Sequence, residues 1–94
     1  MTYKYVPDEV CQKAIDTWGK NPQIMMLLEE ISELQKEVLK NVNRNKDNLK
    51  ELAEETADVY IMLDQLVHMY HMSDAVDAAA QFKLNRLKGY LNMK

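Results

Sequence analysis

The chain has 94 residues and a mass of 11.0 kDa, which suffices for one domain over residues 1–94 and leaves no room for a second. Twelve Lys and Arg against fifteen Asp and Glu give a net charge of -3, and 47% of the residues are hydrophobic. This composition excludes a disordered tail, and a pI near 5.3 argues against a protein that binds nucleic acid. The charges are also separated, because residues 51–64 hold five acids and no base whereas residues 83–94 hold four bases and no acid.

No apolar run approaches the roughly 20 residues that cross a bilayer, and the first residues, MTYKYVPDEV, lack the pattern of a secretory signal. The single cysteine, Cys11, has no partner for an internal disulfide. We therefore expect a cytoplasmic protein without membrane contact, in which Cys11 is a small buried side chain. A chain this short buries only about 60 to 65% of the surface of its unfolded form, so an oligomer is expected.

Two glycines, two prolines and scattered β-branched residues favour an all-α fold. The first helix is expected from Pro7 and Asp8 to about Thr17, because Gly19 and Pro22 follow within a few residues. The second is expected over residues 22–42, where apolar residues recur at three and four. A polar connector, residues 41–47 (NVNRNKD), then leads to the third helix.

The third helix is expected from about residue 47 to residue 72, with its apolar residues on one side. Ser73 is a good N-cap for a fourth helix, which is expected to fray after Gly89 and to bury Val76, Ala80, Leu87 and Leu91. Four helices with short connections predict a bundle of the four-helix type, completed by a second chain.

Two acidic motifs of similar pattern stand on the second and third helices, Glu29-Glu30-x-x-Glu33 and Glu54-Glu55-x-x-Asp58. At about 100° per residue, each motif lies at the same offset from the apolar stripe of its helix. Acids in such a position usually form a solvated face. Here the third helix offers no base at the spacing that would pair with them, although Lys36 and Lys40 are available on the second. Methionines share the sector of the acids, which favours a cavity wall or an interface; these are Met26, Met62 and Met69.

Four carboxylates converge if the two helices pack side by side, and such a cluster requires a cation at neutral pH. Because all the ligands are oxygen atoms, Mg²⁺ is expected, with Mn²⁺ as its substitute. A di-iron bundle is the competing interpretation, but it normally has Glu-x-x-His on two helices, and this chain has none at Glu30 or Glu55. We interpret His68 and His71 as packing or interface residues.

Magnesium held by carboxylates takes further ligands from substrate phosphates, which also require positive charge. Lys83 lies roughly 50° from the apolar stripe of the fourth helix, and Arg86 and Tyr90 share its flank. The alternative interpretation is a lysine that extends along the apolar surface and a solvated arginine.

These motifs together resemble the MazG-like all-α nucleotide pyrophosphohydrolases, especially the short single-domain bacterial and phage kind, over roughly residues 15–88. The matching segments are LLEEISELQKEV, EETADVYIML and FKLNRLKGY. The resemblance implies a four-helix-bundle type of fold that assembles as a homodimer or homotetramer, with active sites where subunits meet. Longer members of the family carry further helices or a second domain, so this short chain depends more heavily on a partner subunit.

The resemblance also implies that an NTP or dNTP is cut between its α and β phosphates, giving a nucleoside monophosphate and pyrophosphate. It implies that the catalytic, metal-binding carboxylates are Glu30, Glu33, Glu55 and Asp58. The same resemblance implies that Lys83 and Arg86 hold phosphates and that Asn85 holds the sugar or base. Two further candidates are Gln23, seven residues before Glu30, and Trp18, whose ring can stack on a base.

One of the four carboxylates, or Glu29 or Glu54 beside them, is expected to accept a proton from the attacking water. No Ser, Cys or His arrangement indicates a covalent intermediate. The alternative function is a non-catalytic helical module that oligomerises or binds a partner through its methionine-rich face.

Overall fold

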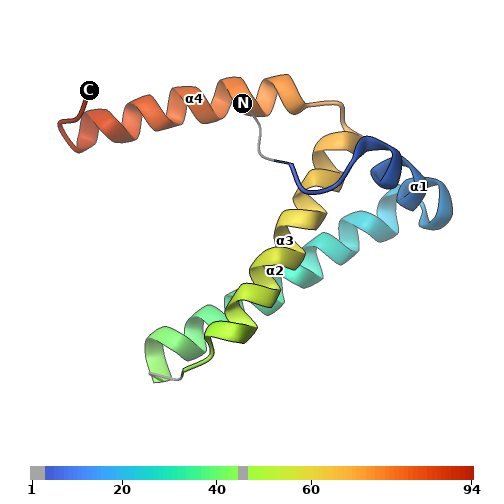
Figure 1. The fold of residues 1–94 in the computed structure, drawn as a ribbon, viewed down its shortest axis with the longest axis horizontal. Coiled ribbons are helices and arrows are strands. Elements are labelled where there is room, and N and C mark those ends of the chain that lie inside the picture. The colour runs from blue at the N-terminus through green and yellow to red at the C-terminus, as the bar shows by residue number, and fades with distance from the viewer. Residues whose placement is uncertain (1–3, 45–46) are drawn as a thin grey trace.

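The computed structural model describes residues 4–44 and 47–94, which form four α-helices and no strand. As Figure 1 shows, the helices are α1 (Asp8–Trp18), α2 (Lys20–Arg44), α3 (Leu49–Met69) and α4 (Ser73–Tyr90). The expected all-α class and the four expected helices are confirmed. The connector is shorter than the sequence indicates, because α2 continues to Arg44, and residues 45–46 lie outside the described part of the chain.

The corner between α1 and α2 is made by one residue. Gly19 has a φ of 90°, a conformation that side chains disfavour, and its N–H donates to the carbonyl of Ile15 at 2.7 Å. Pro22 then stands in the first turn of α2, where its missing N–H is not needed. The expected end of the first helix is therefore confirmed, and Gly19 alone separates α1 from α2.

The centre of the molecule is an antiparallel pair of helices, α2 and α3, called here the α2–α3 hairpin (Figure 1). Leu27 of α2 and Met62 of α3 are among the few buried apolar side chains of the described chain. The helix α1 packs across both partners near one end of the hairpin, and Cys11 of α1 is fully buried, with 0% of its surface exposed. The expectation for Cys11 is confirmed, and burial raises the pKa of its thiol.

The fourth helix departs from its expected packing. No residue of α4 is buried, so the expected burial of Val76, Ala80, Leu87 and Leu91 is wrong for a single chain. A bend at His71, whose φ is 51°, directs α4 away from the hairpin (Figure 1), and α4 contacts no helix except α3. Ser73 is also not the N-cap: the helix begins at Ser73, Met72 precedes it, and no side chain caps the helix.

Within the described ranges, no helix is both long enough and apolar enough to cross a bilayer.

Candidate metal centre

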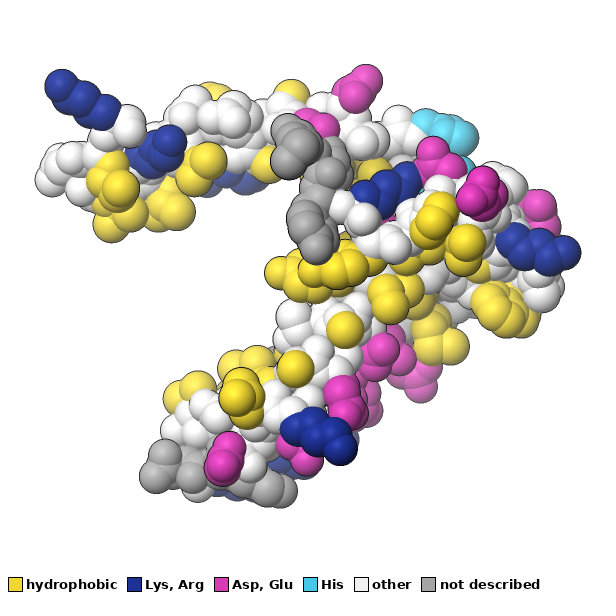
Figure 2. Space-filling view, viewed as in Figure 1, with side chains coloured by type: hydrophobic (Ala, Val, Ile, Leu, Met, Phe, Trp, Pro, Cys, Tyr) yellow, Lys and Arg dark blue, Asp and Glu magenta, His cyan; other side chains and the backbone are white. Residues whose placement is uncertain are grey.

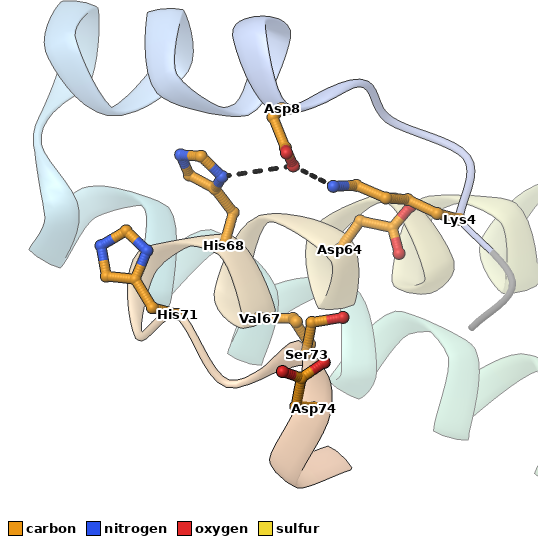
Figure 3. Close-up of a pocket in the computed structure, with 8 residues that line it drawn as sticks. All are labelled: Lys4, Asp8, Asp64, Val67, His68, His71, Ser73 and Asp74. Carbon is orange, nitrogen blue, oxygen red and sulfur yellow. Dashed lines mark hydrogen bonds and ion pairs between the residues drawn. The ribbon is translucent and has the colours of Figure 1, made fainter. Parts of the chain in front are cut away.

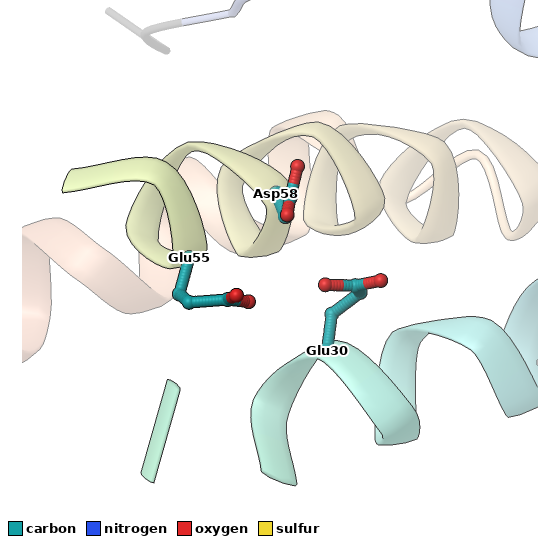
Figure 4. A group of neighbouring side chains, drawn as sticks. All are labelled: Glu30, Glu55 and Asp58. Carbon is teal, nitrogen blue, oxygen red and sulfur yellow. The ribbon is translucent and has the colours of Figure 1, made fainter. Parts of the chain in front are cut away.

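Three carboxylates of the α2–α3 hairpin meet at one point. Glu30 comes from α2, and Glu55 and Asp58 come from successive turns of α3. Figure 4 shows the three side chains turned toward one another between the helices. One oxygen of each carboxylate lies within 4.8 Å of the other two. Glu30 and Glu55 are half-buried and Asp58 is exposed, so the group is open to solvent on one side.

The helix geometry accounts for this convergence. Residues three apart share a helix face, so Glu55 and Asp58 project from α3 together, and the antiparallel packing brings Glu30 level with them. Leu27 stands one turn before Glu30, and Met62 stands one turn after Asp58; both are buried. The packing of α2 against α3 that buries Leu27 and Met62 therefore also places Glu30 beside Glu55 and Asp58.

The charges in this group disfavour full ionisation. Partial burial raises the pKa of Glu30 above its usual value, and the charges of Asp58 and Glu55, with a side-chain hydrogen bond to Asp58, raise it further. Partial burial also raises the pKa of Glu55, followed by the charges of Asp58 and Glu33. A bound cation would offset this repulsion.

The three residues fit a hard divalent ion. All their donor atoms are carboxylate oxygens, which Mg²⁺ and Mn²⁺ prefer. Oxygens that share one Mg²⁺ lie about 3 to 4 Å apart, and the three oxygens here lie within 4.8 Å of one another. Carboxylate side chains need only small rotations to close the difference, and the exposed side leaves room for water and phosphate oxygens. Acidic groups of this kind also occur on proteins without an ion.

Glu33, the fourth expected ligand, lies beside the group and not within it. Its side chain is exposed, and its carboxylate stands 3.9 Å from the ammonium of Lys36. Its charge nevertheless reaches Glu55 and contributes to the raised pKa there. The structure thus brings together three of the four predicted carboxylates and leaves the fourth one turn further along α2.

A buried asparagine holds the hairpin in register near these acids. Asn48, with only 1% of its surface exposed, donates from Nδ2 to the backbone oxygen of Glu37 at 2.9 Å and to its Oε1 at 3.3 Å. Its Oδ1 accepts from Asn41 Nδ2 at 3.1 Å, and Lys40 pairs with Glu37 at 3.0 Å. The sequence predicts Asn48 inside the third helix, expected from about residue 47, and does not indicate that its side chain is buried; the structure begins α3 at Leu49.

The predicted phosphate-binding residues do not reach the acids of their own chain. Lys83, Asn85 and Arg86 are exposed on the second half of α4, and α4 has no contact with α2. Asn85 Oδ1 accepts a hydrogen bond from Gln81 of the same helix at 3.1 Å. Within one chain, the basic end and the acidic centre therefore stay apart.

The two candidate base contacts lie in different surroundings. Gln23 is buried, with 5% of its surface exposed, two turns before Glu30 on α2. Gln65 of α3 is also buried, and its Oε1 has no hydrogen-bond partner within the part of the chain that the structure describes. Trp18 is 64% exposed and lines a shallow surface hollow with Val10.

A second polar cluster, which the sequence did not reveal, joins the segment before α1 to α3 (Figure 3). Asp64 Oδ2 accepts from the backbone N–H groups of Tyr5 at 2.6 Å and Val6 at 2.9 Å. His68 lies 3.5 Å from Asp8 through Nδ1 and 2.9 Å from the side-chain oxygen of Gln12 through Nε2. These partners hold α1 against α3, in keeping with the interpretation of His68 as a packing residue.

Comparison with protein-family models, with curated proteins and with solved structures finds no match to this chain.

Proposed function

We propose that this chain is a Mg²⁺-dependent nucleoside triphosphate pyrophosphohydrolase, which cleaves an NTP or dNTP to a nucleoside monophosphate and pyrophosphate. The observation that carries the proposal is the convergence of Glu30, Glu55 and Asp58 from two helices into one group of oxygen ligands. The same residues belong to the acidic motifs on which the resemblance to MazG-like pyrophosphohydrolases rests. Such an enzyme would serve nucleotide-pool housekeeping in the cytoplasm.

Under this proposal Glu30, Glu33, Glu55 and Asp58 hold Mg²⁺, or Mn²⁺ in its place. The ion, when bound, supplies neutralisation of phosphate charge and acidifies water. One carboxylate of the group accepts the proton of the attacking water. Glu29 and Glu54, the preceding residues of the two acidic motifs, are the other candidates for this role.

The phosphates and the nucleoside need partners outside the acidic group. We assign the phosphates to Lys83 and Arg86, and the sugar or base to Asn85. Because these residues stand away from the hairpin of their own chain, they must come from another copy, in a homodimer or homotetramer. Trp18 and Gln23 are further candidates for contacts with the base, and Gln23 requires a local opening of the hairpin because it is buried.

The test is to incubate the pure protein with a panel of NTPs and dNTPs and Mg²⁺, and to measure nucleoside monophosphate and pyrophosphate. We expect both products from at least one nucleotide, and a loss of at least 100-fold in rate in Glu55→Gln, which is about 2.7 kcal/mol of transition-state stabilisation. Glu9→Gln removes an exposed carboxylate of α1 and should keep full activity. A folded protein that cleaves none of the panel would overturn the proposal.

The exposed apolar surface of the chain favours a second candidate, a non-catalytic helical module that binds a partner. This module requires no metal. It is therefore supported if Mg²⁺ and Mn²⁺ leave the melting temperature unchanged, and rejected if they raise it in the wild type but not in Glu55→Gln.

A further inference from the structure

The bend between α3 and α4 lacks the residues that usually make one. It comprises residues 70–72, and the sequence has no glycine or proline anywhere between Pro22 and Gly89. The corner between α1 and α2, in contrast, has Gly19 at the position with a φ of 90°. The bend has His71 at the equivalent position, with a φ of 51°, and its side chain disfavours this left-handed conformation.

The hydrogen bonds that close the bend are long. The N–H of His71 donates to the carbonyl of His68, and the N–H of Met72 donates to the carbonyl of Val67, both at 3.2 Å, against about 2.9 Å for a typical bond of this kind. Within the part of the chain that the structure describes, no side chain caps the start of α4. The first N–H groups of α4 therefore lack the partner that a longer helix would give them.

The apolar pattern of the two helices runs through the bend without interruption. Over residues 66–84, one residue in every three or four falls on a single stripe; these residues are Leu66, Met69, Ser73, Val76, Ala80 and Leu84. Of the six, only Ser73 is polar. This spacing is typical of one continuous helix, so the residue pattern does not indicate an end of α3 at the place where the structure has one.

Few contacts hold α4 in its bent position. No residue of α4 is buried, and among the described residues α4 contacts no helix except α3. Hydrophobic side chains of α4 remain at the surface on the side of the open angle between α4 and the hairpin (Figure 2); Leu87, for example, is 52% exposed. The bend itself borders a hollow of about 300 Å³, to which it contributes His71, Ser73 and Asp74. Packing therefore adds little to the stability of the bend.

We propose that residues 70–72 form a two-state hinge, at which α3 and α4 exchange between the bent arrangement and one continuous helix from Leu49 to Tyr90. Straightening returns His71 to helical φ, and it pairs the first N–H groups of α4 with carbonyl groups in the last turn of α3. It gives up the hydrogen bonds of the bend and the contact of α4 with the end of α3. Both sets of interactions are small, so both forms are populated.

The hinge determines on which side of the molecule the bases of α4 lie. In the continuous helix, Lys83 comes 25 residues after Asp58, which places it about 37 Å further along and within about 20° of the direction of Asp58. In the bent form α4 leaves the hairpin, and this alignment is lost (Figure 1). The hinge goes beyond the proposed catalytic function. Its test needs neither nucleotide nor metal, so its failure is distinguishable from a failure of the nucleotide assay.

The experiment measures the distance between two spin labels on the full chain by double electron–electron resonance. The labels are attached at Lys50→Cys on α3 and Phe82→Cys on α4, both exposed positions, in a Cys11→Ala background that keeps its helical circular dichroism. An excess of unlabelled chain ensures that only label pairs within one chain contribute. A continuous helix places the two positions about 48 Å apart, and the bent arrangement brings them closer. We expect both distances when the hinge has its natural sequence.

Substitutions of His71 should shift the balance in opposite directions. His71→Gly removes the cost of the left-handed conformation and should raise the ratio of bent to straight chains about 5-fold. His71→Ala favours the helix and should lower this ratio about 3-fold. The matched control is Ala78→Gly, which weakens α4 equally in both forms and should leave the ratio unchanged. A single distance common to the natural hinge and both His71 variants, or equal shifts for His71→Gly and Ala78→Gly, overturns the proposal.

Discussion

At the scale of single residues, the most telling feature is the carboxyl group of Glu30, which lies among other carboxyl groups. Glu30 faces Asp58 and Glu55 across the hairpin, and half-burial removes part of the water that would screen them. A group whose pKa is raised in the folded chain favours folding below its unfolded pKa, and this contribution is lost as the pH rises through the folded pKa. Without a cation, Glu30 therefore opposes folding at neutral pH.

The substitution Glu30→Gln should raise the melting temperature at pH 7 in the absence of divalent ions, because it removes this repulsion. The difference from the wild type should shrink as the pH falls to 4 and below, because the carboxyl group becomes protonated in both states. Thermal unfolding followed by circular dichroism across this range provides the test, with Glu9→Gln as control. A lower melting temperature for Glu30→Gln at pH 7 would show that the three acids do not repel one another.

The loss of the Asn48 side chain should destabilise the fold, because it is buried. Its side chain makes hydrogen bonds to Glu37 and Asn41 from a buried position, and Asn48→Ala removes all of these hydrogen bonds. The expected loss is about 1 to 3 kcal/mol of unfolding free energy, measured by urea denaturation. Asn43→Ala removes an exposed amide from α2 and should change stability by less than about 0.5 kcal/mol; equal losses in the two variants would refute the role of Asn48.

At the scale of elements, the angular positions of residues around each helix predicted the acidic group correctly, because α2 and α3 of one chain pack together. The offset of the acids from the apolar stripes of α2 and α3 was enough to predict that Glu30, Glu55 and Asp58 meet. It could not separate Glu33 from them, because the outcome depends on a small rotation of α2 and on the nearby charge of Lys36. Ser73 was predicted as a cap from residue type alone, but the backbone at the bend begins the helix there.

The packing of α4 could not be predicted from the sequence either, and the physical reason is not the one that applies to Glu33. Its apolar stripe is plain in the sequence, and a stripe indicates burial without indicating what covers it. The expected burial of this stripe did not specify whether the chain itself or a second chain covers it. Similarly, the buried position of Gln23 follows from tertiary packing, because its spacing from Glu30 is the same in a core and in a binding site.

The two glycines provide a test of the helix boundaries, because they should respond oppositely to alanine. Gly19 has a φ of 90°, so Gly19→Ala should cost about 1 to 3 kcal/mol. Gly89 lies within α4, and a methyl group there would meet nothing within 4 Å, so Gly89→Ala should stabilise the chain by about 0.5 to 1 kcal/mol. Chemical denaturation of both variants would contradict these boundaries if the two effects had the same sign.

At the scale of the whole molecule, the separation of charge along the sequence is preserved in space. The acids line the hairpin and the bases lie on a helix that leaves it, so the two halves of the proposed phosphate-binding site do not meet within one chain. The uncovered surface of one chain and the separation of its charges both favour the proposal that the working unit contains more than one copy. Of the proposed site, Glu30, Glu55 and Asp58 are the part that meets within a single copy, and this part can be tested directly.

The most direct test of the central claim is calorimetric titration of the nucleotide-free protein with Mg²⁺, and with Mn²⁺ in a parallel experiment. We predict saturable binding to the wild type and to Glu9→Gln, and affinity reduced at least 10-fold, or about 1.4 kcal/mol, in Glu55→Gln and Asp58→Asn. Equal affinity of the wild type and both carboxylate variants, or no binding to a folded wild type, would contradict the assignment of Glu30, Glu55 and Asp58 as a metal centre.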